Sequence, residues 1–197
     1  MSKMTKTIAA LGVVAGLGVA ALPLSSYATI VTDSTTVTAQ AIIGEAISVT
    51  ADATDDTVKI ENVTANQDVK EGSTVLTIQT NNTSGYNVNI KDSDATTALT
   101  TTGGDAADGI PASATLTKGN KGWGFKASTS TEGVAVSGAG QAYRAIETTP
   151  LALASRSTGA SVQDGDKITL TFGVVVDSSI AAGTYSDDVI ITATTNS

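Results

Sequence analysis

The ten residues Ile168–Asp177, which read ITLTFGVVVD, carry the clearest structural signal in the chain. Apolar side chains occupy every second position, and the intervening positions hold mostly small or polar residues. Strict alternation over this length is typical of a β-strand with one buried face. We therefore predict a strand whose Leu170 and Phe172 are buried in the core. The full inward set is Ile168, Leu170, Phe172, Val174 and Val176.

The same alternation recurs on both sides of this stretch. Downstream, the turn DSSIAAG leads into residues 185–194, and the close spacing predicts a hairpin with 168–177. Upstream, STVLTIQT places Leu76 and Ile78 on one face, and the turn NNTSG predicts a second hairpin with Tyr86–Ile90. Further strands are expected at residues 37–43, 47–51 and 58–60, weakly near Leu99, and around Trp123. Residues 91–115 and 161–166 are rich in turn formers and are expected to be loops.

The chain contains no long stretch with apolar residues at helical spacing. Thr, Val and Ile are abundant, and these β-branched residues fit a pleated surface. Strand signals separated by short Gly, Asp, Ser and Asn turns predict an antiparallel sandwich. We expect a single all-β domain over residues 29–197, an Ig-like or jelly-roll-like β-sandwich.

The first 28 residues have the pattern of a secretory signal peptide. Lys3 and Lys6 precede an apolar run over residues 8–22, and Pro23 and Ser26-Tyr27-Ala28 follow it. A basic start, a short apolar stretch and small residues at the cut are what export machinery recognises. We expect cleavage after Ala28 and a secreted, extracellular protein at the cell surface, without a transmembrane segment once the signal is removed. The alternative is a retained N-terminal anchor helix.

Composition restricts the chemistry. Removal of Lys3 and Lys6 with the signal leaves nine basic against 19 acidic side chains, a net charge of −10. Such a chain repels phosphate backbones, so we expect no nucleic-acid partner. Cys and His are absent, which leaves no Cys nucleophile, no Ser-His-Asp triad and no His-ligated zinc. We expect no catalytic residues and no enzyme activity, although a Ser-Lys pair would remain chemically available.

The C-terminal stretch contains Val176-Asp177, a small loop, and then Ala182-Gly183-Thr184-Tyr185 before a Thr-rich strand. With Ser84-Gly85-Tyr86 and Trp123-Gly124-Phe125, this pattern resembles Thr-rich Ig-like secreted and surface β-sandwich proteins of bacteria. It is more distantly similar to spore-coat-U-like and archaic chaperone–usher pilin domains, which often carry cysteines that this chain lacks. The resemblance covers about half of the mature chain. It implies a surface, coat or fibre role and supplies no catalytic residues.

Aspartate pairs are the candidate metal ligands. Asp92 and Asp94, and likewise Asp164 and Asp166, have the alternate spacing that lets two carboxylates converge on Ca²⁺, which takes six to eight oxygens. These four residues are candidates for a weak calcium site, with no other cofactor expected. Further aspartate pairs, such as Asp187 and Asp188, are interpreted as turn residues. Because Asp is common in turns, a purely structural role in turns is also the alternative for the four calcium candidates.

Two other features bear on partners. A platform for a cell-wall or host glycan would need stacking rings, and Trp123 and Tyr86 are the candidates. A lone Trp near Phe125 is, however, typical of core packing. The first mature residues, TIVTDSTTVTAQA, have strand propensity. They form either an ordinary first strand or a strand donated to the open edge of another subunit.

The sequence therefore favours an exported structural or adhesive cell-surface protein that acts through strand edges and loops. A glycan- or cell-wall-binding module is the alternative, and a pilus-like or coat-like self-assembling subunit is the third reading. The expected partners are copies of itself or related surface proteins, or a glycan.

Overall fold

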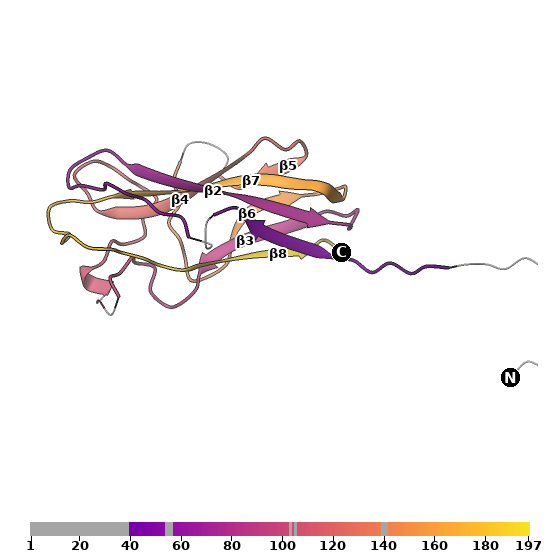
Figure 1. The fold of residues 1–197 in the computed structure, drawn as a ribbon, viewed down its shortest axis with the longest axis horizontal. Helices are drawn as coiled ribbons and strands as arrows, with labels where there is room; N and C mark the ends of the chain where they lie inside the picture. Colours follow the sequence, from indigo (N-terminus) through magenta and orange to yellow (C-terminus); the bar gives the residue numbers. More distant parts are fainter. Residues whose placement is uncertain (1–39, 54–56, 103, 105, 139–141) are drawn as a thin grey trace, which may run out of the picture. The chain divides into compact units, whose positions relative to one another are not determined.

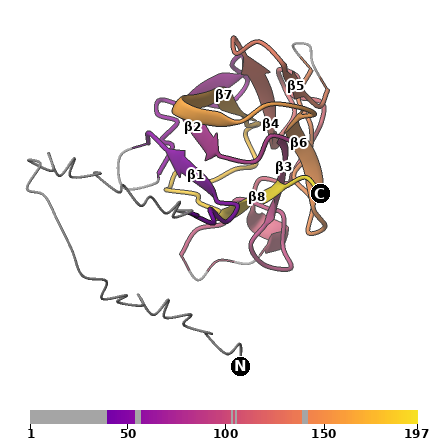
Figure 2. The same ribbon diagram turned by 90° about the vertical axis from the view of Figure 1, so that its right-hand side faces the viewer.

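The computed structural model describes residues 40–53, 57–102, 104, 106–138 and 142–197. From Ile42 onward the chain forms an all-β sandwich of two four-stranded sheets (Figures 1 and 2), which confirms the predicted fold class. The first sheet has the order β1 (Ile47–Ala51), β2 (Lys70–Thr80), β7 (Ser161–Val175) and β4 (Gly122–Thr129). The second has the order β5 (Val134–Val136), β6 (Leu151–Arg156), β3 (Tyr86–Asp92) and β8 (Val189–Thr195). A short 3₁₀ helix, η2, spans Ala106–Asp108.

Every strand pair in both sheets is antiparallel, and the apolar faces of the sheets enclose one core. The predicted inward faces are confirmed for β2 and β3, because Leu76, Ile78, Val88 and Ile90 are buried. On β7 the prediction holds for Leu170, whereas Phe172 is only half-buried. The remaining large buried side chains include Tyr86, Trp123, Phe125, Ile146, Leu153 and Ile168.

Both predicted hairpins are wrong. The turn after β2 carries the chain into the other sheet, where β3 pairs with β6 and β8. Likewise β7 pairs with β2 and β4, and β8 lies in the opposite sheet. A short connection between two alternating segments fits a sandwich crossing as well as a hairpin, and alternation alone does not distinguish them.

Several weaker strand predictions also change. Residues 161–166, expected to form a turn, are the first part of β7, and Val58–Ile60 forms no strand. Leu99 makes a single bridge with Ile110. Strand β6, which follows Pro150, was not predicted. The signal peptide and residues 37–39 of the expected first strand lie outside the described residues, and residues 40–46 are not in a strand.

The sandwich has two long sides where the edge strands of its sheets face each other. We call the side with β4 and β5 the closed seam and the side with β1 and β8 the open seam (Figure 2). In the described part of the chain, no helix is long and apolar enough to cross a bilayer.

Candidate functional site

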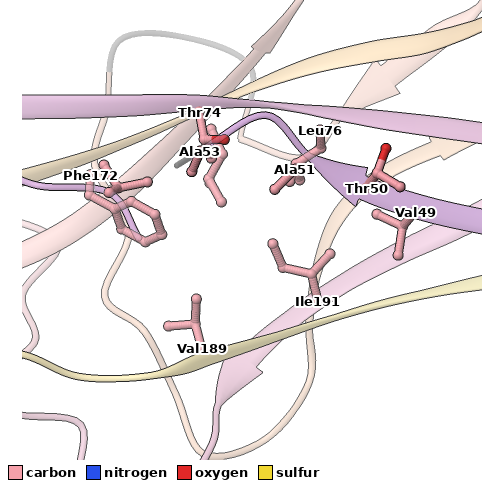
Figure 3. A pocket seen from close by; sticks show the side chains of 11 residues that line it. Val49, Thr50, Ala51, Ala53, Thr74, Leu76, Phe172, Val189 and Ile191 are labelled. Carbon is pink, nitrogen blue, oxygen red and sulfur yellow. The ribbon is translucent and has the colours of Figure 1, made fainter. Parts of the chain in front are cut away.

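An apolar groove of about 250 Å³ runs along the open seam (Figure 3). Strand β1 supplies Val49 on one side, and β8 supplies Val189 and Ile191 on the other. Its remaining walls come from Ala51, Ala53, Val58, Thr50, Thr74, Leu76, Leu170 and Phe172. A cavity of about 150 Å³ holds a benzene molecule, so this groove has room for one or two large aliphatic side chains.

The strands beside the groove keep their inward faces only partly covered. Ile47 and Val49 on β1, and Val189, Ile191 and Ala193 on β8, are half-buried, although these positions face the core. Leaving this apolar surface accessible to water loses roughly 25 cal/mol for each Å² that is not buried. Covering the open seam with another apolar segment would therefore stabilise the protein.

The backbone of both edge strands also lacks partners on its outer side. The amide of Asp52 donates to the Val75 carbonyl at 3.1 Å, and the amide of Asn81 donates to the Ala46 carbonyl at 3.4 Å. Since antiparallel pairs alternate, the even-numbered residues of β1 bond to β2, and the odd-numbered ones direct N–H and C=O outward. The bond from Ser93 N–H to the Asp188 carbonyl gives β8 the same arrangement toward β3. Within the described residues, neither outer edge is paired.

The closed seam is finished differently. The amide and carbonyl of Phe125 exchange hydrogen bonds with Arg144, at 2.9 and 2.7 Å. The amide of Trp123 donates to the Pro111 carbonyl at 3.0 Å, and its carbonyl accepts from Ser113 at 2.7 Å. Two loop segments thus occupy the outer edge of β4. Trp123 and Phe125 are 4% and 1% exposed as a result.

The side chain of Asn81 holds the chain where it enters β1. The side-chain carbonyl of Asn81 accepts from Ala46 N–H at 2.7 Å, and its amide donates to the Gly44 carbonyl at 2.9 Å. Beyond this clamp, Ile42 and Ile43 are 90% and 84% exposed.

A cluster of carboxylates lies where β3 ends and the chain approaches β8. Oxygen atoms of Asp92, Asp94 and Asp187 are all within 4.8 Å of one another. The sequence placed Asp92 and Asp94 together but left Asp187 as a turn residue. The only sequence signal for Asp187 was its place in the Asp187-Asp188 pair directly before a Thr-rich strand. Identifying Asp187 as a third member of the cluster requires knowing that β8 pairs with β3.

The other two predicted ligands do not join this cluster. Asp164 is exposed on β7. Asp166 is buried, accepts a 2.7 Å hydrogen bond from the Tyr86 hydroxyl, and lies 3.4 Å from an Arg156 guanidinium nitrogen. Burial, and then the bond to Asp166, raise the pKa of Tyr86 above its ordinary value. Tyr86, Asp166 and Arg156 therefore link the two sheets, and Asp166 already has an ion-pair partner.

The aromatic side chains form no exposed platform. Trp123 donates from its indole nitrogen to the Thr97 carbonyl at 2.9 Å, and its ring centroid is 6.2 Å from that of Phe172. Tyr86 is fully buried in the core. Every aromatic ring in the described part of the chain is buried or half-buried, so the two rings suggested for glycan stacking do not meet at the surface.

Comparison with known proteins returns no match to a family model, to a curated protein or to a solved structure.

Proposed function

We propose that the mature protein is an exported structural or adhesive subunit of the cell surface, and that it acts by accepting a β-strand along its open seam rather than by catalysis. The observation that carries this proposal is the coincidence of an apolar groove with two unpaired strand edges. An added strand would satisfy the outward backbone groups, and its alternate side chains would fill the groove.

The proposed donor is the N-terminal segment of another copy of this chain. Val37, Ala39, Ala41 and Ile43 share one face of that segment if it is extended. Ile43 is 84% exposed in the single chain, although burying such a side chain is worth about 1.5–3 kcal/mol. Asn81 bonds to Ala46 and Gly44, so the donor segment would extend from an anchored start beside β1. The exposure of Ile43 in the single chain favours donation to a neighbour over self-closure.

The glycan-binding alternative has less support. Stacking on a sugar needs an accessible ring face, and Trp123 and Tyr86 are both buried. A polar surface loop could still contact a glycan, but no particular residue in the described chain singles out such a site.

The test uses the mature chain, residues 29–197, followed by light scattering and negative-stain electron microscopy over a range of concentrations. We expect oligomers or fibres. Deletion of residues 29–36 should weaken assembly, and Val37→Asp combined with Ile43→Asp should abolish it, because charges would then face the groove. The matched control is Thr36→Asp with Thr38→Asp, which adds the same charge on the opposite face and should leave assembly largely intact.

Urea unfolding of each variant separates assembly from folding. The double Asp variants should unfold at the same midpoint as the parent when both are monomeric. A parent that stays monomeric at every concentration would contradict the proposal. So would a deletion that simply unfolds the sandwich, since the segment would then be an intramolecular strand.

A further inference from the structure

We propose that Asp92, Asp94 and Asp187 bind one Ca²⁺ ion, which joins the end of β3 to the start of β8. This inference is independent of strand donation. It concerns one end of the sandwich and the chemistry of three carboxylates.

The spacing of the carboxylates suits a single ion. Ca²⁺ lies about 2.3–2.6 Å from its oxygen ligands, so two ligands on one ion are at most about 5 Å apart. One oxygen from each of Asp92, Asp94 and Asp187 meets this condition, since these three atoms lie within 4.8 Å of one another. Six to eight ligands are usual, and water would supply those that the protein does not.

The buried carboxylate provides separate evidence for a ligand. Asp92 is 1% exposed, and its Oδ1 accepts the Asp94 amide at 2.9 Å. Its Oδ2 is buried and has no hydrogen-bond partner, and the same holds for Oδ2 of Asp187. An unpaired buried carboxylate oxygen is costly, because the charge loses its water without gaining a donor or a counter-ion. A cation between the two groups would satisfy both oxygens.

Among the described residues, no basic side chain forms a salt bridge with these carboxylates. The two salt bridges among the described residues join Lys126 to Glu71 and Arg156 to Asp166, away from this cluster. Burial, and then the neighbouring Asp92 carboxylate, raise the pKa of Asp187 to about 7. A proton shared by Asp92 and Asp187 is the competing explanation.

The third carboxylate is prepared to act as a ligand. Oδ1 of Asp94 accepts hydrogen bonds from the Thr96 amide, at 2.6 Å, and from the Thr96 hydroxyl, at 2.9 Å, which fix the orientation of the carboxylate. Both bonds go to Oδ1, and Asp94 is exposed, so its second oxygen can approach an ion from the solvent side. Oxygen-only donors favour a hard cation, and a partly open site accommodates the flexible geometry of Ca²⁺ better than the octahedral geometry of Mg²⁺.

Binding would fix the position of β8. Asp92 is the register partner of Val189, the first residue of β8, and Ser93 N–H donates to the Asp188 carbonyl at 3.0 Å. An ion held by Asp92 and Asp187 would hold the same two segments together through side chains. Because the ion would bind the folded state alone, it would raise the melting temperature.

The experiment measures thermal unfolding of the chelator-treated mature chain at mildly alkaline pH, with CaCl₂ or MgCl₂ added up to millimolar concentration, and calorimetric titration with Ca²⁺. We expect Ca²⁺ at about ten times its Kd to raise Tm by roughly 3–6 °C. Asp187→Asn should remove this shift. Asp188→Asn, which makes the same charge change at the exposed neighbouring residue, should retain it. Asp94→Asn provides a second, exposed ligand variant should Asp187→Asn fail to fold, and it should weaken calcium binding.

Three results would overturn the assignment. The first is no calcium-dependent shift, with a higher Tm for Asp187→Asn than for the parent; the carboxylates would then share a proton. The second is an equal shift in the parent, Asp187→Asn and Asp94→Asn, which would reflect general screening of an acidic chain. The third is an equal response to Mg²⁺ at the same concentration, which would exclude a calcium-selective site.

Discussion

The open and closed seams of the sandwich have the same kind of uncovered strand edge, but only the closed seam is covered by loops. Each joins the edge strands of two sheets, and each leaves apolar side chains and outward backbone groups to be covered. At the closed seam, Pro111–Ser113 and Arg144 bond to the edge of β4 and keep Trp123 and Phe125 buried. At the open seam, no described segment plays this part, and a groove remains between β1 and β8. The difference shows that the loops, rather than the strands, decide whether an edge is available.

Two phenylalanine side chains allow the closed and open seams to be compared directly. Phe125 on β4 and Phe172 on β7 are register partners, yet Phe125 is 1% exposed and Phe172 lines the open groove. One residue belongs to the closed side and the other reaches the open side. Their substitution therefore compares the two seams with the chemistry held constant.

The largest effect is expected from Phe125→Ala. Removing a fully buried Phe typically costs about 3–5 kcal/mol, because the transfer free energy is lost and a cavity remains. Phe172→Ala should cost about half as much in the monomer, since part of its ring is already accessible and the groove can relax. Urea unfolding of both variants measures the two free energies. Equal losses would mean that the groove is closed in solution and that the two seams do not differ.

The closed seam depends on the absence of a side chain at one position. A Cβ added at Gly124 would lie 2.4 Å from the Ser113 carbonyl oxygen and 2.6 Å from that of Arg144. Both are backbone atoms of the segments that cover β4, so Gly124→Ala should push these segments away. We expect a loss of about 1–3 kcal/mol in unfolding free energy, the range for overpacking. Faster amide exchange at Phe125 should accompany it.

Gly44→Ala is the control for this prediction. No atom lies within 4 Å of a Cβ built at Gly44, which precedes the open seam. Its unfolding free energy should stay within about 0.5 kcal/mol of the parent. If Gly124→Ala were equally neutral, the loops would not be closely packed on β4, and the closed seam would owe its burial to the strands alone.

The inward faces of single strands were predictable because they depend on alternation within each segment. Leu76, Ile78, Val88, Ile90 and Leu170 all lie where the pattern placed them. The strand order was not predictable in this way, since it depends on which distant segments meet. The error at Phe172 has the same origin: its side chain points inward, but its burial depends on a seam formed by β1 and β8.

The acidic cluster shows the same dependence on the pairing of distant segments. Asp92 and Asp94 are separated by one residue along the chain, so their convergence follows from local spacing. Asp187 joins them only because β8 pairs with β3, with Asp92 opposite Val189. Asp166 does not join the cluster for a similar reason, because β3 and β6 bring Tyr86 and Arg156 to it. Local sequence therefore identifies candidate ligands, whereas the tertiary pairing selects among them.

The sharpest test of the open edge, with only a small change in stability, is expected from Ala51→Pro. Ala51 is exposed, and as an odd-numbered residue of β1 it directs its N–H away from β2. Proline removes that N–H and is tolerated on edge strands, so the bonds between β1 and β2 should survive and the unfolding free energy should change by less than about 1 kcal/mol.

A strand docking along β1 would lose a hydrogen bond and meet the proline ring, so assembly of the mature chain should weaken strongly. Ala51→Ser keeps the N–H and adds a single oxygen atom at the groove wall, so it should assemble nearly like the parent, and light scattering of the two variants at matched concentration compares them directly. If both variants assemble equally well, the incoming strand does not bond to β1. The outer edge of β8, where Val189, Ile191 and Ala193 present their backbone groups, would then be the remaining edge of the open seam to accept it.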